Sequence, residues 1–226
     1  MIAPGLMNTT TDVCTHTGSE FPFTWGAEPS STTFETIIGT PQEDACLWQQ
    51  QTTPFTCAVV AQRGIIEAFT GETLSEAQLV YEATANGWLT DGGMSPLDAS
   101  QLLELHGISC HIQTGATVEQ LLAELTQGHK VIAGVDAGEL WRQDSPLEDS
   151  FCQVTDHAIW VTGVDMSNPT HPQIFVNDSG DPAGAGKAYD LTNFVDAWQD
   201  SGFFYVATDH APPYMQPITQ VLDPAL

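Results

Sequence analysis

Apolar residues along this chain follow a helical period in the first half and a period of two in the second. From Pro54 onward, the segment TPFTCAVVAQRGIIEAFTG has apolar residues at 58, 59, 60, 65, 66 and 69, which predicts a largely buried helix ending at Gly71. Cys57 lies in the first turn of this helix. The sequence therefore predicts a thiol at a helix N-terminus.

Capping residues predict three further helices. The segments EAQLVYEATANG, PLDASQLLELHG and VEQLLAELTQG each end in a glycine, which commonly terminates a helix. Their capping residues are Ser75 with Gln78, Ser95 with Pro96 and Asp98, and Thr117 with Gln120.

The second half of the chain is dominated by strand patterns. KVIAGVD, HAIWVTGVD, QIFVND and FFYVATD read as strands, with a capped helix, LTNFVDAWQDSG, before the last of them. Helices that precede strands in this way favour an α+β fold, in which N-terminal helices pack on an antiparallel sheet, over a doubly wound βαβ fold.

One domain is expected between two less regular ends. Residues 1–40 are rich in Thr, Ser, Gly and Pro without a sustained period, which is typical of an extended N-terminal segment. Residues 41–212 would form the folded domain, and the proline-containing stretch 213–226 would be a C-terminal tail.

The charge balance excludes several classes of partner. Four Lys and Arg residues against 29 Asp and Glu residues give a net charge of -25, which repels nucleic-acid backbones and anionic lipid surfaces. No apolar run approaches the roughly 18 residues of a membrane span, and the first residues lack the pattern of a signal peptide. We expect a soluble protein with no nucleic-acid partner, whose charge would attract cationic peptides. A cytoplasmic and a secreted location both stay open.

The five cysteines show no metal-binding spacing. They are Cys14, Cys46, Cys57, Cys110 and Cys152. Because no CxxC pair is present, neither a structural zinc nor another cofactor is expected. If one cysteine is a reactive thiol, the other four could form up to two disulfides or be buried apolar residues.

Two residues near the first helix suggest thiol chemistry. A helix N-terminus lowers the pKa of a cysteine, and its free backbone N–H groups can hold an oxyanion, so Cys57 is a candidate nucleophile. Gln51 lies six residues before Cys57, and its side-chain amide is a candidate donor to the same oxyanion.

The candidate base comes from a predicted hairpin. If the two strands in TDHAIWVTGVDMSNPTHPQIFVNDSG are symmetric about residues 167 and 168, His157 lies directly opposite Asp178 on one face. Apolar residues share that face: Ile159, Val161, Ile174 and Val176. The Asp178 carboxylate would orient the imidazole of His157, leaving its other nitrogen for Cys57. A register slip of one residue would bring in Asn177 instead.

The order Gln51, Cys57, His157, Asp178 resembles the papain-like cysteine peptidase superfamily. It is most similar to the double-glycine-leader peptidases of bacteriocin exporters and their stand-alone bacterial relatives, which carry a glutamine six residues before the cysteine. The resemblance covers about residues 45 to 210 and includes the turn NDSG at 177–180. It implies a nucleophile at Cys57, an acid and base at His157, an orienting carboxylate at Asp178 and an oxyanion donor at Gln51.

The sequence departs from the leader peptidases in three respects. Ala58 replaces the glycine that usually follows the cysteine, and Ser179 replaces a frequent proline in the turn. The 226 residues also contain no transporter, so the resemblance does not imply a double-glycine leader as substrate.

Three functions follow as hypotheses. The first is a cysteine peptidase that attacks a peptide or isopeptide bond and forms an acyl-enzyme at Cys57. The second is a non-catalytic peptide-binding or toxin-neutralising module with the same fold. The third is a structural cell-surface domain held by disulfides.

Overall fold

The structure, a computed structural model, describes residues 37–141 and 155–213. The strands in these ranges are β1 (Ile37–Gly39), β2 (Leu89–Thr90), β3 (Gly93–Met94), β4 (Cys110–Gln113), β5 (Val131–Val135), β6 (His157–Asp165), β7 (Gln173–Asn177), β8 (Lys187–Asp190) and β9 (Tyr205–Thr208). The helices are α1 (Pro41–Ala45), α2 (Cys57–Thr70), α3 (Glu76–Ala85), the short 3-10 helix η1 (Pro96–Asp98), α4 (Gln101–Leu105), α5 (Val118–Thr126), α6 (Ala137–Leu140) and α7 (Leu191–Gln199).

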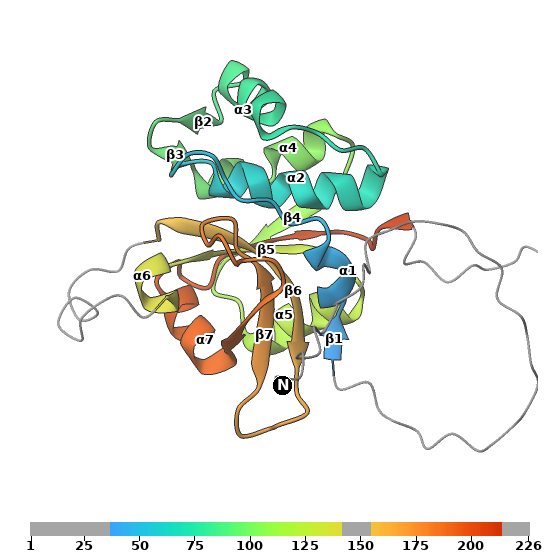
Figure 1. The fold of residues 1–226 in the computed structure, drawn as a ribbon, viewed down its shortest axis with the longest axis vertical. Helices are drawn as coiled ribbons and strands as arrows, with labels where there is room; N and C mark the ends of the chain where they lie inside the picture. The colour runs from blue at the N-terminus through green and yellow to red at the C-terminus, as the bar shows by residue number, and fades with distance from the viewer. Residues whose placement is uncertain (1–36, 142–154, 214–226) are drawn as a thin grey trace, which may run out of the picture. The chain divides into compact units, whose positions relative to one another are not determined.

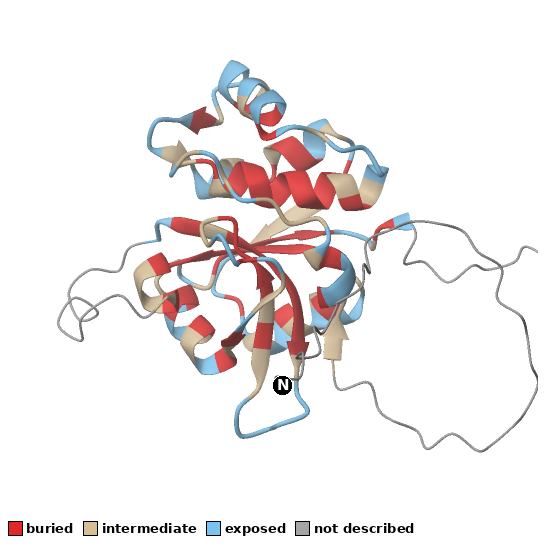
Figure 2. Ribbon diagram, in the orientation of Figure 1, coloured by how far each residue is buried: buried red, intermediate tan, exposed pale blue. Residues whose placement is uncertain are grey.

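A central antiparallel sheet separates two layers of helices. Its strand order is β4-β9-β5-β6-β7-β8, and β1 pairs with the second half of β6. In Figure 1, α2, α3 and α4 lie on one side of the sheet and α5, α6 and α7 on the other. Each face has its own apolar core, and the central strands β5, β6 and β9 are largely buried between them (Figure 2). The fold is therefore α+β, as the segregation of helix and strand patterns predicts.

Most of the predicted elements are confirmed. Helix α2 spans Cys57–Thr70 and is capped at its C-terminus by Gly71, whose φ of 71° is the left-handed conformation that glycine adopts without strain. The side chain of Ser75 caps α3 by accepting a hydrogen bond from the backbone of Gln78. Thr117 and Gln120 form a complete capping box on α5.

The predicted helix PLDASQLLELHG is wrong as a single element. The structure divides it into η1 and α4. Ser95 does not cap η1, because its hydroxyl donates to the carboxylate of Asp98 at 2.6 Å. A buried glutamine from α2 starts α4 instead: the Gln62 Oε1 accepts the backbone N–H groups of Leu102 at 3.1 Å and Leu103 at 3.3 Å. These bonds satisfy donors that an uninterrupted helix would have paired internally.

The predicted register of the β6–β7 hairpin is also wrong. Trp160 pairs with Asn177, two residues further along than a hairpin symmetric about 167 and 168 requires. The loop between the strands runs from 166 to 172, and an irregularity between Val161 and Gly163 shifts the pairing by one more residue. Because the initial error is two residues, it leaves the faces unchanged. The four apolar residues assigned to one face do share one buried core: Ile159, Val161, Ile174 and Val176.

The ends of the chain fall largely outside the described residues. Of the predicted N-terminal segment 1–40, only residues 37–40 are described, and Ile37–Gly39 forms β1. The predicted tail 213–226 is described only at its first residue. The expected domain limits therefore stay a prediction. Within the described ranges, the helices are too short or too polar to cross a membrane.

Helix α2 lies so close to β6 that a glycine is needed between them. A Cβ atom on Gly64 would approach the Trp160 ring to 2.7 Å, and Trp160 is only 1% exposed. We expect Gly64→Ala to lower the free energy of unfolding by about 1–3 kcal/mol, because overpacking outweighs the roughly 1 kcal/mol that alanine gains over glycine in a helix.

Urea unfolding measures this loss, with Gly92→Ala as the matched control. A Cβ atom on Gly92 would lie 3.6 Å from its nearest neighbour, which is an ordinary contact. A Gly64→Ala protein as stable as the parent would contradict the close approach.

Candidate active site

Cys57 is the first residue of α2, and its thiol is free and partly accessible. The preceding residue, Thr56, does not cap the helix with its side chain, so the backbone N–H groups of the first turn stay open. Burial alone would raise the pKa of the Cys57 thiol. The hydrogen bond and charge of His157, together with backbone hydrogen bonds from Ala158 and Ala58, outweigh burial and lower this pKa below its ordinary value.

His157 lies at the start of β6, between the thiol and a carboxylate. Its ring is buried, and Nε2 lies 2.8 Å from Oδ1 of Asp178. Since Nε2 contacts the carboxylate, Nδ1 is the nitrogen left for Cys57. Burial alone would lower the pKa of His157, but hydrogen bonds and charge interactions with Asp178 and Cys57 raise it to about 10.

Asp178 is completely buried just beyond the end of β7. Its Oδ1 also accepts the backbone N–H of Gly180 at 3.0 Å. Its Oδ2 accepts the indole N–H of Trp141 at 2.8 Å and the hydroxyl of Tyr189 at 3.1 Å. Burial would raise the carboxyl pKa, but the bonds from His157, Trp141 and Gly180 hold it at about 2. The carboxylate therefore stays ionised inside the protein.

Asn177, the alternative orienting residue suggested by the sequence, makes hydrogen bonds elsewhere. Its side chain points to α1, where Nδ2 donates to the backbone carbonyl of Asp44 at 2.7 Å and Oδ1 accepts the N–H of Gly186 at 3.0 Å. The residue that contacts His157 is Asp178, although the predicted pairing directly opposite His157 does not occur. The loop after β7 brings Asp178 to the histidine.

Gln51 lies beside the loop that follows Asp178. Its backbone N–H donates to the carbonyl of Ser179 at 3.0 Å, and its Oε1 accepts the Ser179 hydroxyl at 2.8 Å. Its Nε2 donates to the carbonyl of Thr53 at 2.7 Å. Within the described residues, Gln51 is thus tied to the site through its neighbours, and no hydrogen bond joins it to Cys57.

Comparisons with known proteins identify the family of the chain. The Peptidase_C39-like family matches residues 34–206 of the chain. The chain belongs to this family. Uncharacterized proteins of Mycobacterium tuberculosis and Mycobacterium bovis are 30% identical to it over 209 residues, covering 80% of this chain and 88% of theirs.

Solved structures of C39-like proteins share the fold. A putative C39-like peptidase from Bacillus anthracis superimposes with a TM-score of 0.55 at 16% identity, covering 76% of this chain and 96% of that one. The peptidase domain of Streptococcus ComA, a bifunctional ABC transporter of a quorum-sensing pathway, gives a TM-score of 0.51 at 15% identity, covering 73% and 97%. This C39-like chain therefore has the papain-like peptidase fold.

Contacts to Asp178 from three further residues were not predicted from the sequence. Trp141 and Tyr189 come from separate elements, and both donate to Oδ2 of Asp178. Trp48, after α1, donates its indole N–H to the Asp178 carbonyl at 2.8 Å. The sequence does contain a signal for Gly180, because this residue belongs to the NDSG turn. A Cβ atom on Gly180 would lie 3.1 Å from both the His157 ring and the Trp141 ring. Its glycine identity allows the turn to pack against the imidazole.

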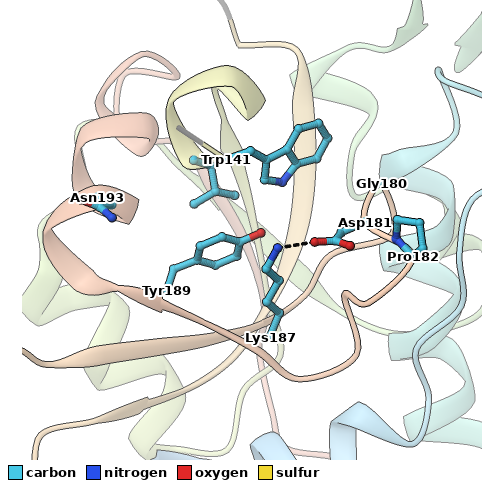
Figure 3. A pocket seen from close by; sticks show the side chains of 8 residues that line it. Trp141, Gly180, Asp181, Pro182, Lys187, Tyr189 and Asn193 are labelled. Atoms are coloured by element: carbon cyan, nitrogen blue, oxygen red, sulfur yellow. Dashed lines mark hydrogen bonds and ion pairs between the residues drawn. The ribbon is translucent and has the colours of Figure 1, made fainter. Parts of the chain in front are cut away.

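A cavity of about 440 Å³ lies between α6, β8 and the loop after β7 (Figure 3). Trp141 and Tyr189 line it and also donate to Asp178, so they separate the cavity from the carboxylate. Lys187 and Asp181 form an ion pair at its wall. The cavity therefore offers aromatic surface and a polar pair. Its link to the histidine is Trp141, whose ring centroid lies 5.5 Å from that of His157, while neither His157 nor Cys57 lines the cavity.

The other cysteines differ from Cys57 in their chemistry. Cys46 is disulfide-bonded. Cys110 is free, but burial and the nearby carboxylates of Glu104 and Asp209 raise its pKa to about 12. Cys14 and Cys152 lie outside the described residues. Of the free thiols that the described ranges contain, only Cys57 has a lowered pKa.

The buried Asp178 carboxylate should make the free energy of unfolding depend on pH in the acidic range. Its pKa is about 2 in the folded protein and about 4 when the chain is unfolded, so its contribution is present above pH 4 and is lost as the pH falls toward 2. We expect a loss of about 2 kcal/mol in the free energy of unfolding across this window, measured by urea titration at each pH.

The variant Asp178→Asn should lack this part of the acid dependence, whereas Asp91→Asn, which removes an exposed carboxylate, should retain it. Parallel pH curves for the parent and Asp178→Asn would contradict the lowered pKa.

Proposed function

We propose that this protein is a cysteine peptidase that cleaves a peptide or isopeptide bond through an acyl-enzyme at Cys57. The proposal rests on one arrangement: His157 lies between the Cys57 thiol and the buried Asp178 carboxylate, with the Nε2–Oδ1 distance at 2.8 Å. A lowered cysteine pKa beside a raised histidine pKa favours a thiolate–imidazolium pair at neutral pH.

Each group has a role in this reaction. The Cys57 thiolate attacks the carbonyl carbon, and the developing oxyanion accepts hydrogen bonds from the backbone N–H at the start of α2 and from the Gln51 amide. The His157 imidazolium donates a proton to the leaving amine, so the C–N bond breaks and a thioester remains. Neutral His157 then takes a proton from water, which hydrolyses the thioester and restores the thiolate. Asp178 keeps the imidazole oriented and stabilises its positive charge.

A peptide or protein is the substrate class that fits this site. The family is named for peptidases, and the cavity lined by Trp141, whose ring centroid lies 5.5 Å from that of His157, has room for part of a chain. The net charge of -25 favours encounter with cationic substrates.

Iodoacetamide alkylation between pH 4 and 9 tests the ion pair. We expect Cys57 to react quickly at pH 6, where an ordinary thiol with a pKa near 8.5 is almost wholly protonated. The variant His157→Ala should slow the reaction at pH 6 by about tenfold or more, because the thiolate loses its cation. Cys110 serves as the internal control and should stay unreactive at that pH, since its pKa is about 12.

Mass spectrometry after exposure to p-nitrophenyl acetate tests the acyl transfer. An acetyl group on Cys57 in the parent, absent from Cys57→Ser, is the expected result. If Cys57 titrates as an ordinary thiol in both the parent and His157→Ala and gains no acetyl group, the peptidase proposal fails.

A further inference from the structure

A buried carboxylate outside the candidate triad organises the segment that leads into Cys57. Glu76 is the first residue of α3 and only 5% exposed. Its Oε1 accepts the hydroxyls of Thr56 at 2.6 Å and Thr52 at 3.0 Å, and both oxygens lie 3.1 Å from the Thr52 backbone nitrogen. Its Oε2 accepts the Gln49 side-chain amide at 3.4 Å. A single carboxylate thus gathers three residues of the segment 49–56.

The donors recorded for Glu76 within the described ranges are all neutral. A carboxylate that leaves water without a cationic partner loses solvation that hydrogen bonds must replace. The position of the carboxylate therefore points to a role in shaping the loop rather than to packing.

The loop that Glu76 holds carries Gln51. The bonded residues Gln49 and Thr52 flank Gln51 in sequence, and Thr53 accepts the Gln51 amide at 2.7 Å. On the other side, Ser179 fixes Gln51 to the turn after Asp178. Gln51 is thus held by hydrogen bonds on two sides: by Thr53 in the segment that Glu76 binds, and by Ser179 in the turn that follows Asp178.

Glu76 also acts on the first turn of α2. Thr56 occupies the N-cap position, where a threonine hydroxyl normally accepts a backbone N–H from the helix. The Thr56 hydroxyl donates to Glu76 at 2.6 Å, which turns its oxygen toward the Thr53 hydroxyl that it accepts at 3.1 Å, and α2 has no side-chain cap. The N–H groups beside Cys57 consequently stay available to a thiolate or an oxyanion.

We propose that Glu76 is a positioning residue for the oxyanion site, which it builds by fixing the segment 49–56 relative to Cys57. This inference rests on the proposed function, since it concerns the same acyl transfer. Within the described residues no hydrogen bond joins Glu76 to the thiol or to the imidazole, so it would act through Thr56 and through the neighbours of Gln51. Its loss should impair attack on a carbonyl while leaving the thiolate itself intact.

Two reagents separate these effects. Acylation of Cys57 by p-nitrophenyl acetate forms an oxyanion, whereas alkylation by iodoacetamide displaces iodide and forms none. We expect Glu76→Ala to slow acylation by at least about tenfold, given that loss of one oxyanion donor costs about 10²–10³. The rate and pH profile of iodoacetamide alkylation should stay within about twofold of the parent.

Glu82→Gln is the matched control. Glu82 lies on the same helix, and its substitution removes the same charge. Its side chain contacts His106 and Gln78 rather than the segment 49–56. It should leave both rates unchanged. Glu76→Gln, which keeps the volume and one acceptor oxygen, should fall between the parent and Glu76→Ala and carries the test if the alanine protein does not fold.

A double-variant comparison tests the route through Gln51. If Glu76 acts mainly through that residue, Gln51→Ala combined with Glu76→Ala should slow acylation clearly less than the product of the two single losses. Parent-like acylation in both Glu76 variants, an equal fall in acylation and alkylation, or fully multiplicative losses would each overturn the inference. Failure of the parent itself to be acylated would instead overturn the proposed function.

Discussion

The hydrogen bond between His157 and Asp178 is the interaction on which the candidate site depends. It pairs two groups that would each be costly to bury alone, because an isolated charge loses several kcal/mol of solvation. Trp141, Tyr189 and Gly180 supply the remaining donors to the carboxylate and so keep it ionised. An ionised Asp178 favours a protonated His157, and a protonated His157 favours a thiolate at Cys57.

Two helices of the surrounding fold hold this bond in place. Helix α2 packs on β6 at Gly64 and brings its N-terminus to the start of the strand. The buried ion pair of Lys130 with Asp44 holds α1, where the Asp44 carbonyl accepts the side-chain amide of Asn177. Because Asn177 precedes Asp178 in the chain, α1 constrains the turn that carries the carboxylate. The candidate site is thus assembled from segments that lie more than 100 residues apart.

The sequence predicts the parts of this account that arise from local rules. The helix at Cys57 follows from apolar spacing and a terminal glycine, and the cap of α5 from Thr117 and Gln120. The sequence predicted the contact between His157 and Asp178 and the face of the sheet on which it lies, but it predicted the wrong strand register. The irregularity in β6 and the length of the loop shift the register, and neither has a recognisable sequence pattern. Glu76 was not predicted at all. Its partners lie some 20 residues away, and a glutamate in the first turn of a helix is ordinary.

The protonation state of His157 tests the central claim most directly. Nitrogen chemical shifts of the imidazole, measured by NMR at pH 7 in a ¹⁵N-histidine-labelled protein, distinguish an imidazolium from a neutral ring. We predict an imidazolium in the parent that persists to about pH 10, since both neighbours of the ring favour its charge. Cys57→Ser should lower that pKa because the thiolate is gone. A neutral ring at pH 7 in the parent, unchanged in Cys57→Ser, would contradict the thiolate–imidazolium pair.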